Sequence, residues 1–170
     1  MSTPQPTPLA HAPKPSSASI SAAASVPAAA APSHFQLLGG REQVQALVES
    51  FYAQMDQRPE ARAIRAMHPA DLGPVKAVLI SYLCEWLGGP REYSAQRGHP
   101  RLRMRHQPFA IGDAERDAWL ACMQAALQDT EVPPGLRQAL MQAFSKTADH
   151  LRNRAAGHPV PSTLPRTDHD

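Results

Sequence analysis

Four segments of this sequence repeat apolar residues every three or four positions, and that repeat limits the chain to a helical architecture. Alternation of apolar and polar residues, which is typical of strands, is scarce, and aromatic residues make up only 5% of the chain. The sequence therefore predicts an all-α fold class. The four apolar faces are Val44, Leu47, Val48, Phe51, Tyr52 and Met55; Val75, Val78, Leu79, Tyr82, Leu83 and Trp86; Trp119, Cys122, Met123, Ala126 and Leu127; and Leu136, Leu140, Phe144, Thr147, Ala148 and Leu151.

Glycine, proline and capping residues indicate where these helices begin and end. We expect a first helix after Gly39-Gly40 that ends near Arg58-Pro59, a second from Asp71 to Leu87, a third with Asp113 as its N-cap, and a fourth after Pro133-Pro134. The intervening segment 91–111 has no long apolar period.

The first 33 residues differ in composition from the helical region. Seven of the 18 prolines lie there, and Pro, Ala and Ser together make up 24 of those 33 residues, with Lys14 as the only charged residue. Such a segment buries too little apolar surface to offset its ordering entropy. We therefore predict a disordered extension at 1–33, one helical domain at 34–153, and a flexible tail at 154–170.

The charge balance argues against two classes of partner. The formal net charge is only +2, which is too small to indicate nucleic acid or a membrane surface as a partner of the whole chain. No apolar run is long enough to span a membrane, and the N-terminus lacks the features of a secretory signal.

Cys84 and Cys122 lie inside apolar helical patterns without zinc-site spacing. We expect core cysteines in a reducing compartment, and hence a cytoplasmic protein.

A local cluster of basic residues occupies the segment between the second and third helices. Its five arginines face one acidic residue, Glu92, and His99 and His106 are interleaved with them. The cluster could hold an anion, either nucleic-acid phosphates or cofactor carboxylates, or it could be a solvated loop. The arginines are Arg91, Arg97, Arg101, Arg103 and Arg105.

Three polar-tipped rings lie among apolar neighbours. His106 is surrounded in sequence by apolar residues, and Tyr52 and Trp119 lie on otherwise apolar helix faces that could cover a flat cofactor. A lone histidine is more often a structural residue than a ligand. A buried Tyr or Trp also needs a hydrogen-bond partner, and a backbone carbonyl in the core would serve. The residues alone leave both interpretations open.

Several of these residues form longer motifs that resemble a known family. The chain contains Trp86-Leu87-Gly88-Gly89-Pro90-Arg91, Tyr93-Ser94, Gly98-His99-Pro100-Arg101-Leu102-Arg103-Met104-Arg105-His106, Pro108-Phe109 and Asp117-Ala118-Trp119-Leu120, preceded by Gly39-Gly40 and Phe51-Tyr52. Together they resemble a bacterial truncated haemoglobin of the second group. The resemblance covers about residues 35–152.

The resemblance implies a truncated globin fold, in which two antiparallel helix pairs enclose a b-type haem in a two-over-two sandwich. It implies that His106 is the proximal iron ligand, and that Tyr52, His68 and Trp119 surround the bound ligand on the other face. It further implies that Val75, Val78, Leu79, Tyr82 and Ile111 contact the haem, and that Tyr93, His99, Arg101 and Arg105 are candidates for holding its propionates.

Two positions depart from the family pattern. His68 stands where relatives usually carry Tyr or Phe, and an imidazole there could donate a hydrogen bond, titrate near neutrality or approach the iron. Val78 stands where relatives often have Lys or Arg, so the arginines after Gly89 would carry more of the propionate binding.

Binding of dioxygen or another diatomic ligand is the function that the resemblance implies. Donors fixed beside the ligand would stabilise its partial negative charge by about 1 to 3 kcal/mol per charge-assisted bond. Tyr52 and Trp119 can donate, whereas Val75 and Leu79 cannot. A peroxidase-like or nitric oxide dioxygenase enzyme with an external reductase is one alternative. A haem-free helical interaction module is the other, and the protein could be a monomer or a homodimer.

Overall fold

The structure is a computed structural model that describes residues 31–154 of the chain. The predicted terminal segments therefore lie almost entirely outside the described residues. Within the described range all regular elements are helices, which confirms the all-α fold class. They are α1 (His34–Leu38), α2 (Arg41–Gln57), a 3-10 turn (Pro59–Ala61), α3 (Arg62–Ala66), α4 (Gly73–Trp86), α5 (Glu92–Arg97), α6 (Leu102–His106), α7 (Asp113–Asp129) and α8 (Pro134–Leu151).

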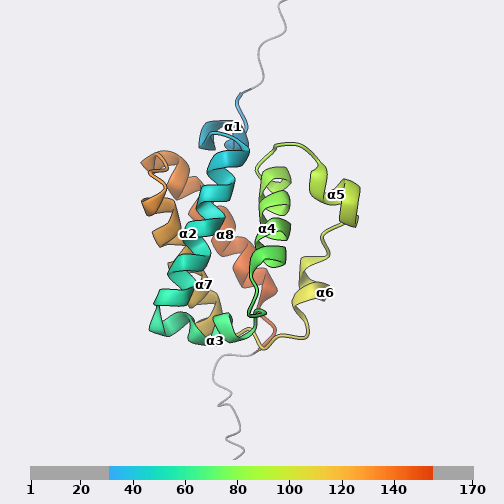
Figure 1. Ribbon diagram of the computed structural model, residues 1–170, viewed down its shortest axis with the longest axis vertical. Helices are drawn as coiled ribbons and strands as arrows, with labels where there is room; N and C mark the ends of the chain where they lie inside the picture. The colour runs from blue at the N-terminus through green and yellow to red at the C-terminus, as the bar shows by residue number, and fades with distance from the viewer. Residues whose placement is uncertain (1–30, 155–170) are drawn as a thin grey trace, which may run out of the picture. The chain divides into compact units, whose positions relative to one another are not determined.

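The four long helices form two pairs. Helix α2 packs beside α4, α7 packs on α8, and the two pairs meet mainly where α2 contacts α7 (Figure 1). The short helices α5 and α6 lie to one side of α4, and α3 lies at the end of the sandwich that also holds the start of α7 (Figure 1). This arrangement confirms the two-over-two helical sandwich.

Helix α2 is the most deeply buried element, and the apolar repeat predicts its orientation correctly. All six residues of its predicted face are buried, each with an exposed fraction of 2% or less. A face that recurs every three to four residues along 17 residues covers one side of a helix, so burial follows from the sequence period alone. The predicted start and end of this helix are also confirmed.

The predicted apolar face of helix α4 is mostly half-buried. Of the predicted face only Leu83 is buried, and the other buried residues are Ile80, Ser81 and Cys84. The remaining five members of the predicted face are half-buried. Helix α4 is apolar around most of its circumference, so its period does not show which side meets the core.

A glycine pair ends α4 as expected, by a defined hydrogen-bond pattern. The Gly88 N–H donates to the Glu85 carbonyl (3.0 Å) and the Gly89 N–H to the Cys84 carbonyl (2.8 Å), with Gly88 at φ +90°. These bonds form a Schellman motif, which requires a residue with positive φ just after the helix. A side chain at Gly89 would also collide with Phe35 and the Cys84 carbonyl.

The start of α7 corrects the predicted N-cap. Asp113 is the first helical residue and Gly112 is the N-cap. The Glu115 carboxylate accepts the Gly112 N–H (2.9 Å), so the acidic side chain three residues after the cap performs the capping. Cys84 and Cys122 are both buried, and burial raises the pKa of each thiol.

The arginine-rich segment folds into the two short helices α5 and α6, which are too short to show an apolar period. Tyr93 is the one buried residue of α5, and α6 has none.

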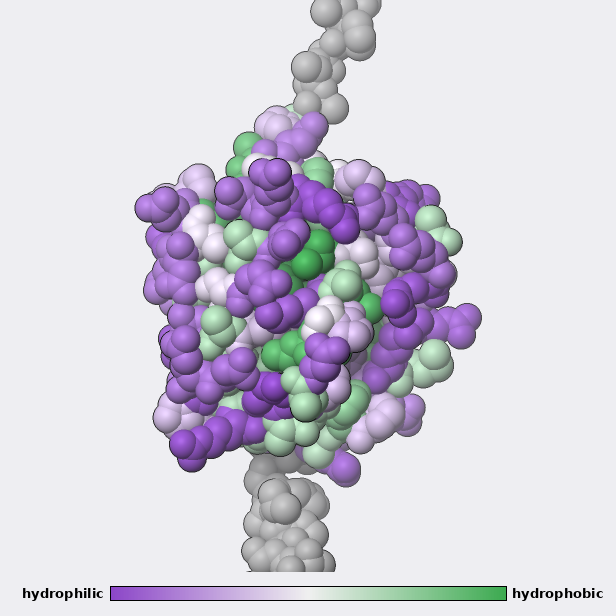
Figure 2. Space-filling model, in the orientation of Figure 1, coloured by the Kyte–Doolittle hydropathy of each residue, from purple (hydrophilic) through white to green (hydrophobic). Residues whose placement is uncertain are grey.

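The described helices include none that is long and apolar enough to cross a membrane. Polar and charged side chains cover most of the face in Figure 2, and apolar side chains show between them near its middle.

Candidate ligand-binding site

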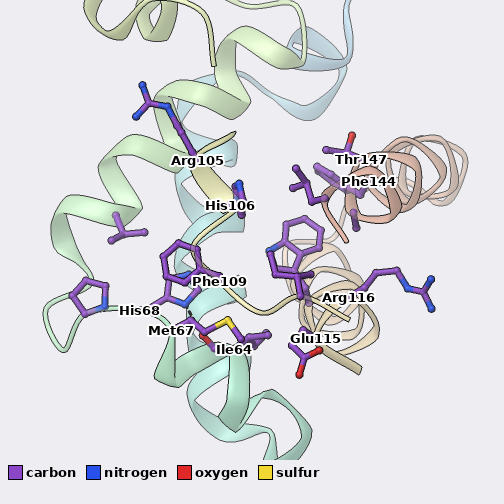
Figure 3. A pocket seen from close by; sticks show the side chains of 16 residues that line it. Ile64, Met67, His68, Arg105, His106, Phe109, Glu115, Arg116, Phe144 and Thr147 are labelled. Carbon is purple, nitrogen blue, oxygen red and sulfur yellow. Dashed lines mark hydrogen bonds between the residues drawn. The ribbon is translucent and has the colours of Figure 1, made fainter. Parts of the chain in front are cut away.

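A cavity of about 350 Å³ opens among α3, α4, α6, α7 and α8. Its volume lies in the range of small-molecule sites, and most of the side chains around it are apolar (Figure 3). It brings together residues far apart in the sequence. The sequence-predicted residues that line it are His68, Val75, Arg105, His106, Ile111 and Trp119.

His106, the last residue of α6, is half-buried at the cavity wall (Figure 3). Its Nδ1 lies 2.7 Å from the Leu102 carbonyl oxygen, one helical turn earlier. Because a carbonyl can only accept, Nδ1 carries the proton and donates. In the neutral ring the lone pair is therefore on Nε2, the nitrogen that a metal ion would use.

His68 follows α3 and uses the same kind of bond. Its Nδ1 donates to the Ile64 carbonyl at 2.8 Å, so Nε2 is an acceptor while the ring is neutral. The ring lies edge-on to Tyr52, with 5.6 Å between ring centres. Arg65 supports the loop after His68 by donating to the Pro69 carbonyl at 3.1 Å.

Tyr52 and Trp119 are placed differently relative to the cavity. Tyr52 is 2% exposed, contacts the His68 ring and does not line the cavity, whereas Trp119 lines it and packs against Phe51 and Phe144. Among the described residues, neither the Tyr52 hydroxyl nor the Trp119 indole N–H is a fully buried polar atom without a hydrogen-bond partner. Burial raises the pKa of Tyr52 to about 12, so its hydroxyl remains a protonated donor at neutral pH.

Of the four α4 residues predicted to contact haem, only Val75 lines the cavity. Val78, Leu79 and Tyr82 are half-buried. Tyr82 packs edge-on against the buried Tyr93, with 5.5 Å between ring centres. Tyr93 therefore belongs to the packing between α4 and α5, and it does not line the cavity.

The basic residues predicted to bind propionates are mostly exposed. Arg105 lines the cavity while its Nε donates to the Pro100 carbonyl (3.0 Å), and its guanidinium extends away from His106 in Figure 3. His99 borders a separate hollow with Arg91, and Arg101 caps α6 in the left-handed conformation (φ +45°). The structure does not bring His99 and Arg101 to the cavity.

Ten lining residues were not predicted as site residues. The apolar period of α8 contains four of them, but a period cannot tell whether a face meets the core or a cavity. The others come from α3, from loops and from the first turn of α7, where the sequence carried no signal for the site. The ten are Ile64, Met67, Pro69, Phe109, Glu115, Arg116, Phe144, Thr147, Ala148 and Leu151.

Comparison with known proteins identifies this arrangement. Residues 33–153 match the family of bacterial-like globins. The group 2 truncated hemoglobin YjbI of Bacillus subtilis (strain 168) is 34% identical over 115 residues, which are 68% of this chain and 85% of the relative.

Two solved structures are also similar. The group II 2-on-2 hemoglobin of Agrobacterium tumefaciens is 40% identical, with a TM-score of 0.71, over 74% of this chain and 98% of that one. The hemoglobin of the thermophilic phototrophic bacterium Chloroflexus aurantiacus is 43% identical, with a TM-score of 0.68, over 73% of this chain and all of that one. The chain therefore belongs to the bacterial-like globin family, with the fold of the two-on-two truncated haemoglobins.

Proposed function

We propose that this chain binds haem b through Nε2 of His106 and holds dioxygen, or another diatomic ligand, beside Trp119. The observation that carries the proposal is the Nδ1–H bond from His106 to the Leu102 carbonyl (2.7 Å) at the cavity wall. This bond orients the ring and leaves Nε2 unprotonated, as an iron ligand must be.

The residues around the cavity fit a haem group. Most of the lining side chains are apolar, and the adjoining α4 face formed by Val75, Val78, Leu79 and Tyr82 is apolar yet only half-buried. A flat apolar group would bury such a face. Arg105, at the cavity edge, carries a charge suited to a propionate.

Haem supplies the iron coordination position at which a diatomic ligand binds. The Trp119 indole N–H, which has no acceptor function and does not titrate, offers such a ligand a donor at every pH. Tyr52 stays protonated because burial raises its pKa to about 12, so it can donate either to the ligand or to Nε2 of His68. His68 itself accepts at Nε2 unless its ring is protonated.

Replacing the two cavity histidines one at a time tests this assignment. We expect the purified full chain to show a haem Soret band, and His106→Gly to lose most of its haem or its iron–histidine vibrational band. Added imidazole should restore the band, because it can occupy the space left by the side chain. His68→Gly is the matched control, since it removes an imidazole with the same local hydrogen bond, and it should retain haem.

Two results would contradict the proposal. Normal haem content and an unchanged iron–histidine band in His106→Gly would show that another residue binds the iron. A purified chain without a Soret band, which also fails to take up added haem, would favour the haem-free interaction module.

A further inference from the structure

Asn153, the second residue after α8, is bonded to His106 and to the segment that follows it. The Asn153 Nδ2 group donates to the carbonyls of Phe109 (2.8 Å) and His106 (3.2 Å). Its Oδ1 accepts the Ile111 N–H (3.0 Å), and its own backbone N–H donates to the Ile111 carbonyl (2.9 Å). One amide side chain thus uses both donor hydrogens and its acceptor on three residues between positions 106 and 111.

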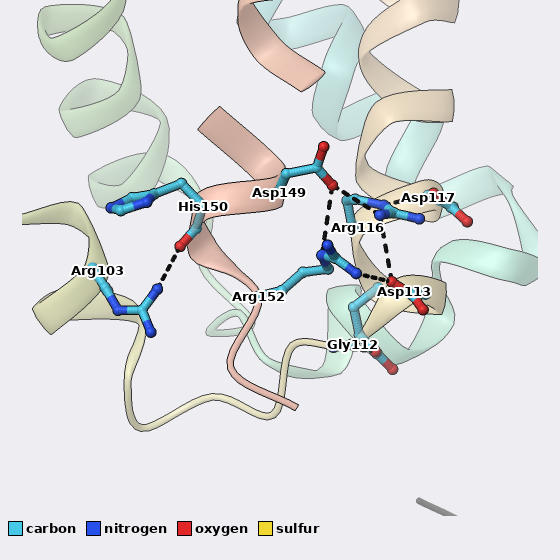
Figure 4. Close-up of polar contacts among 9 residues, drawn as sticks. Arg103, Gly112, Asp113, Arg116, Asp117, Asp149, His150 and Arg152 are labelled. Carbon is cyan, nitrogen blue, oxygen red and sulfur yellow. Dashed lines mark hydrogen bonds and ion pairs between the residues drawn. The ribbon is translucent and has the colours of Figure 1, made fainter. Parts of the chain in front are cut away.

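These bonds matter because little else fixes α6. The helix has five residues and none of them is buried, so core packing does not define its position. A helix this short is not stable by itself. The other described tie between α6 and α8 is the Arg103 guanidinium, which donates to the His150 carbonyl at 2.9 Å (Figure 4).

The end of α8 that carries Asn153 is itself held in place. Arg116 of α7 bonds to Asp149 of α8 at 2.8 Å and lies 3.4 Å from Asp113, and Arg152 also bonds to Asp113 (Figure 4). Two arginines and two aspartates therefore join the start of α7 to the end of α8. Such a network defines a geometry more strongly than one isolated surface pair does.

We propose that Asn153 is a positioning residue for His106, and that its amide sets where α6 presents the imidazole to the iron. The proposal rests on the proposed function, because it concerns the iron ligand. The amide binds the carbonyl of His106, the last residue of α6, and the carbonyl of Phe109 in the loop beyond it. The His106 carbonyl has no partner within α6 and otherwise accepts the N–H of Phe109 at 3.1 Å, so the Asn153 amide ties the last turn, and the ring that it carries, to the end of α8.

Two variants separate the donor groups of Asn153 from its acceptor. Asn153→Asp keeps the size and the acceptor for the Ile111 N–H, but it replaces both donated bonds by repulsion between carboxylate and carbonyl oxygens. Asn153→Ala removes all three side-chain bonds without adding charge. Gln107→Glu is the matched control, because it adds the same charge to the same segment at an exposed side chain that has no hydrogen bond in the described structure.

The full chain with haem bound is measured in three ways. We expect both Asn153 variants to shift or broaden the ferrous iron–histidine stretching band and to lose haem about threefold to tenfold faster than the parent. Hydrogen exchange of the Ile111 amide should accelerate in Asn153→Ala and remain slow in Asn153→Asp. Gln107→Glu should match the parent in all three measurements.

The outcomes distinguish this proposal from the proposed function. An iron–histidine band that is present in the parent and unchanged in both Asn153 variants would overturn the positioning role and leave His106 as the ligand. Faster haem loss with an unchanged band would also overturn it, because that result indicates loosened structure without a change at the histidine. A parent protein without the band would overturn the proposed function, and the positioning role with it.

Discussion

Two walls of the cavity present a histidine through the same local bond but are supported in different ways. The α3 wall consists of Ile64, Met67, His68 and Pro69, and the α6 wall of Arg105, His106 and Phe109. In each wall the histidine Nδ1–H donates to the carbonyl four residues earlier, at 2.8 Å for His68 and 2.7 Å for His106. The local chemistry of the two rings is therefore nearly identical.

The supports behind the two rings differ. His68 lies edge-on to Tyr52, a core residue of α2, and Ile64 of the same wall is also buried. No residue of α6 is buried, and hydrogen bonds from the end of α8 hold its wall. The α3 wall thus belongs to the core, whereas the position of the α6 wall depends on a few polar contacts. Under the proposed function, bound haem would be a further support for the α6 wall, because it would be coordinated there.

Removing the indole N–H of Trp119, which lies between the two walls, should produce the largest effect on ligand dissociation. Trp119 lies on α7 and lines the cavity. Trp119→Phe keeps an aromatic ring but removes the N–H, so we expect the dioxygen dissociation rate to rise about tenfold, equivalent to about 1.4 kcal/mol. Carbon monoxide dissociation, measured by the same stopped-flow replacement experiment, should change less because that ligand carries less negative charge.

The other tryptophan provides the control for this experiment. Trp86 stacks on Phe144 with 5.0 Å between ring centres, and it does not line the cavity. Trp86→Phe should leave both dissociation rates unchanged. Equal rises in the two variants, or a loss of thermal stability in Trp119→Phe without any change in rate, would indicate that the Trp119 indole acts by packing.

The α3 wall is supported by the core helix α2, and the difference between α2 and α6 also explains what the sequence could predict. The six apolar residues of α2 recur over 17 residues, so their period identified both the helix and its buried side. Helix α6 has five residues, which is too short for any period. His106 was predicted as the iron ligand through motif resemblance, and no local pattern indicated the helix that carries it.

Contacts between distant residues account for most of what the sequence did not predict. Asn153 bonds to the His106 carbonyl across 47 positions of the chain, and an asparagine after a helix does not indicate such a partner. The burial of α4 could not be predicted for a related reason. Apolar residues surround that helix, and only the packed structure shows that Ile80 and Cys84 meet the core while Val75 meets the cavity.

A smaller effect is expected from a charge on the α6 wall. Arg105 is exposed at the cavity edge, where we propose that it pairs with a haem propionate. Arg105→Gln should accelerate haem transfer to an acceptor globin about twofold to fivefold at low salt, since exposed ion pairs contribute about 0.2 to 1 kcal/mol. The difference should shrink as salt is added. Arg97→Gln, at the exposed end of α5, is the control. Equal rates of haem transfer in the two variants at every salt concentration would contradict the propionate role of Arg105.

The smallest effect concerns the α3 wall and appears only at alkaline pH. Burial raises the pKa of Tyr52 to about 12, from an ordinary value of 10.0, so the folded protein retains the phenol proton after the unfolded chain has begun to lose it. The contribution of the Tyr52 hydroxyl to the free energy of unfolding is therefore fully present below about pH 10 and is lost as the pH rises from 10 towards 12. The urea midpoint should therefore fall less between pH 8 and 11 in Tyr52→Phe than in the parent, because phenylalanine has no proton to lose.

Tyr82 also has a pKa raised to about 12 by burial, so Tyr82→Phe should show a similar alkaline effect while leaving ligand dissociation unchanged. A Tyr52→Phe variant whose midpoint falls as steeply as that of the parent would show that Tyr52 is not held neutral by the core, and the α3 wall would then be less firmly part of the core than its packing indicates.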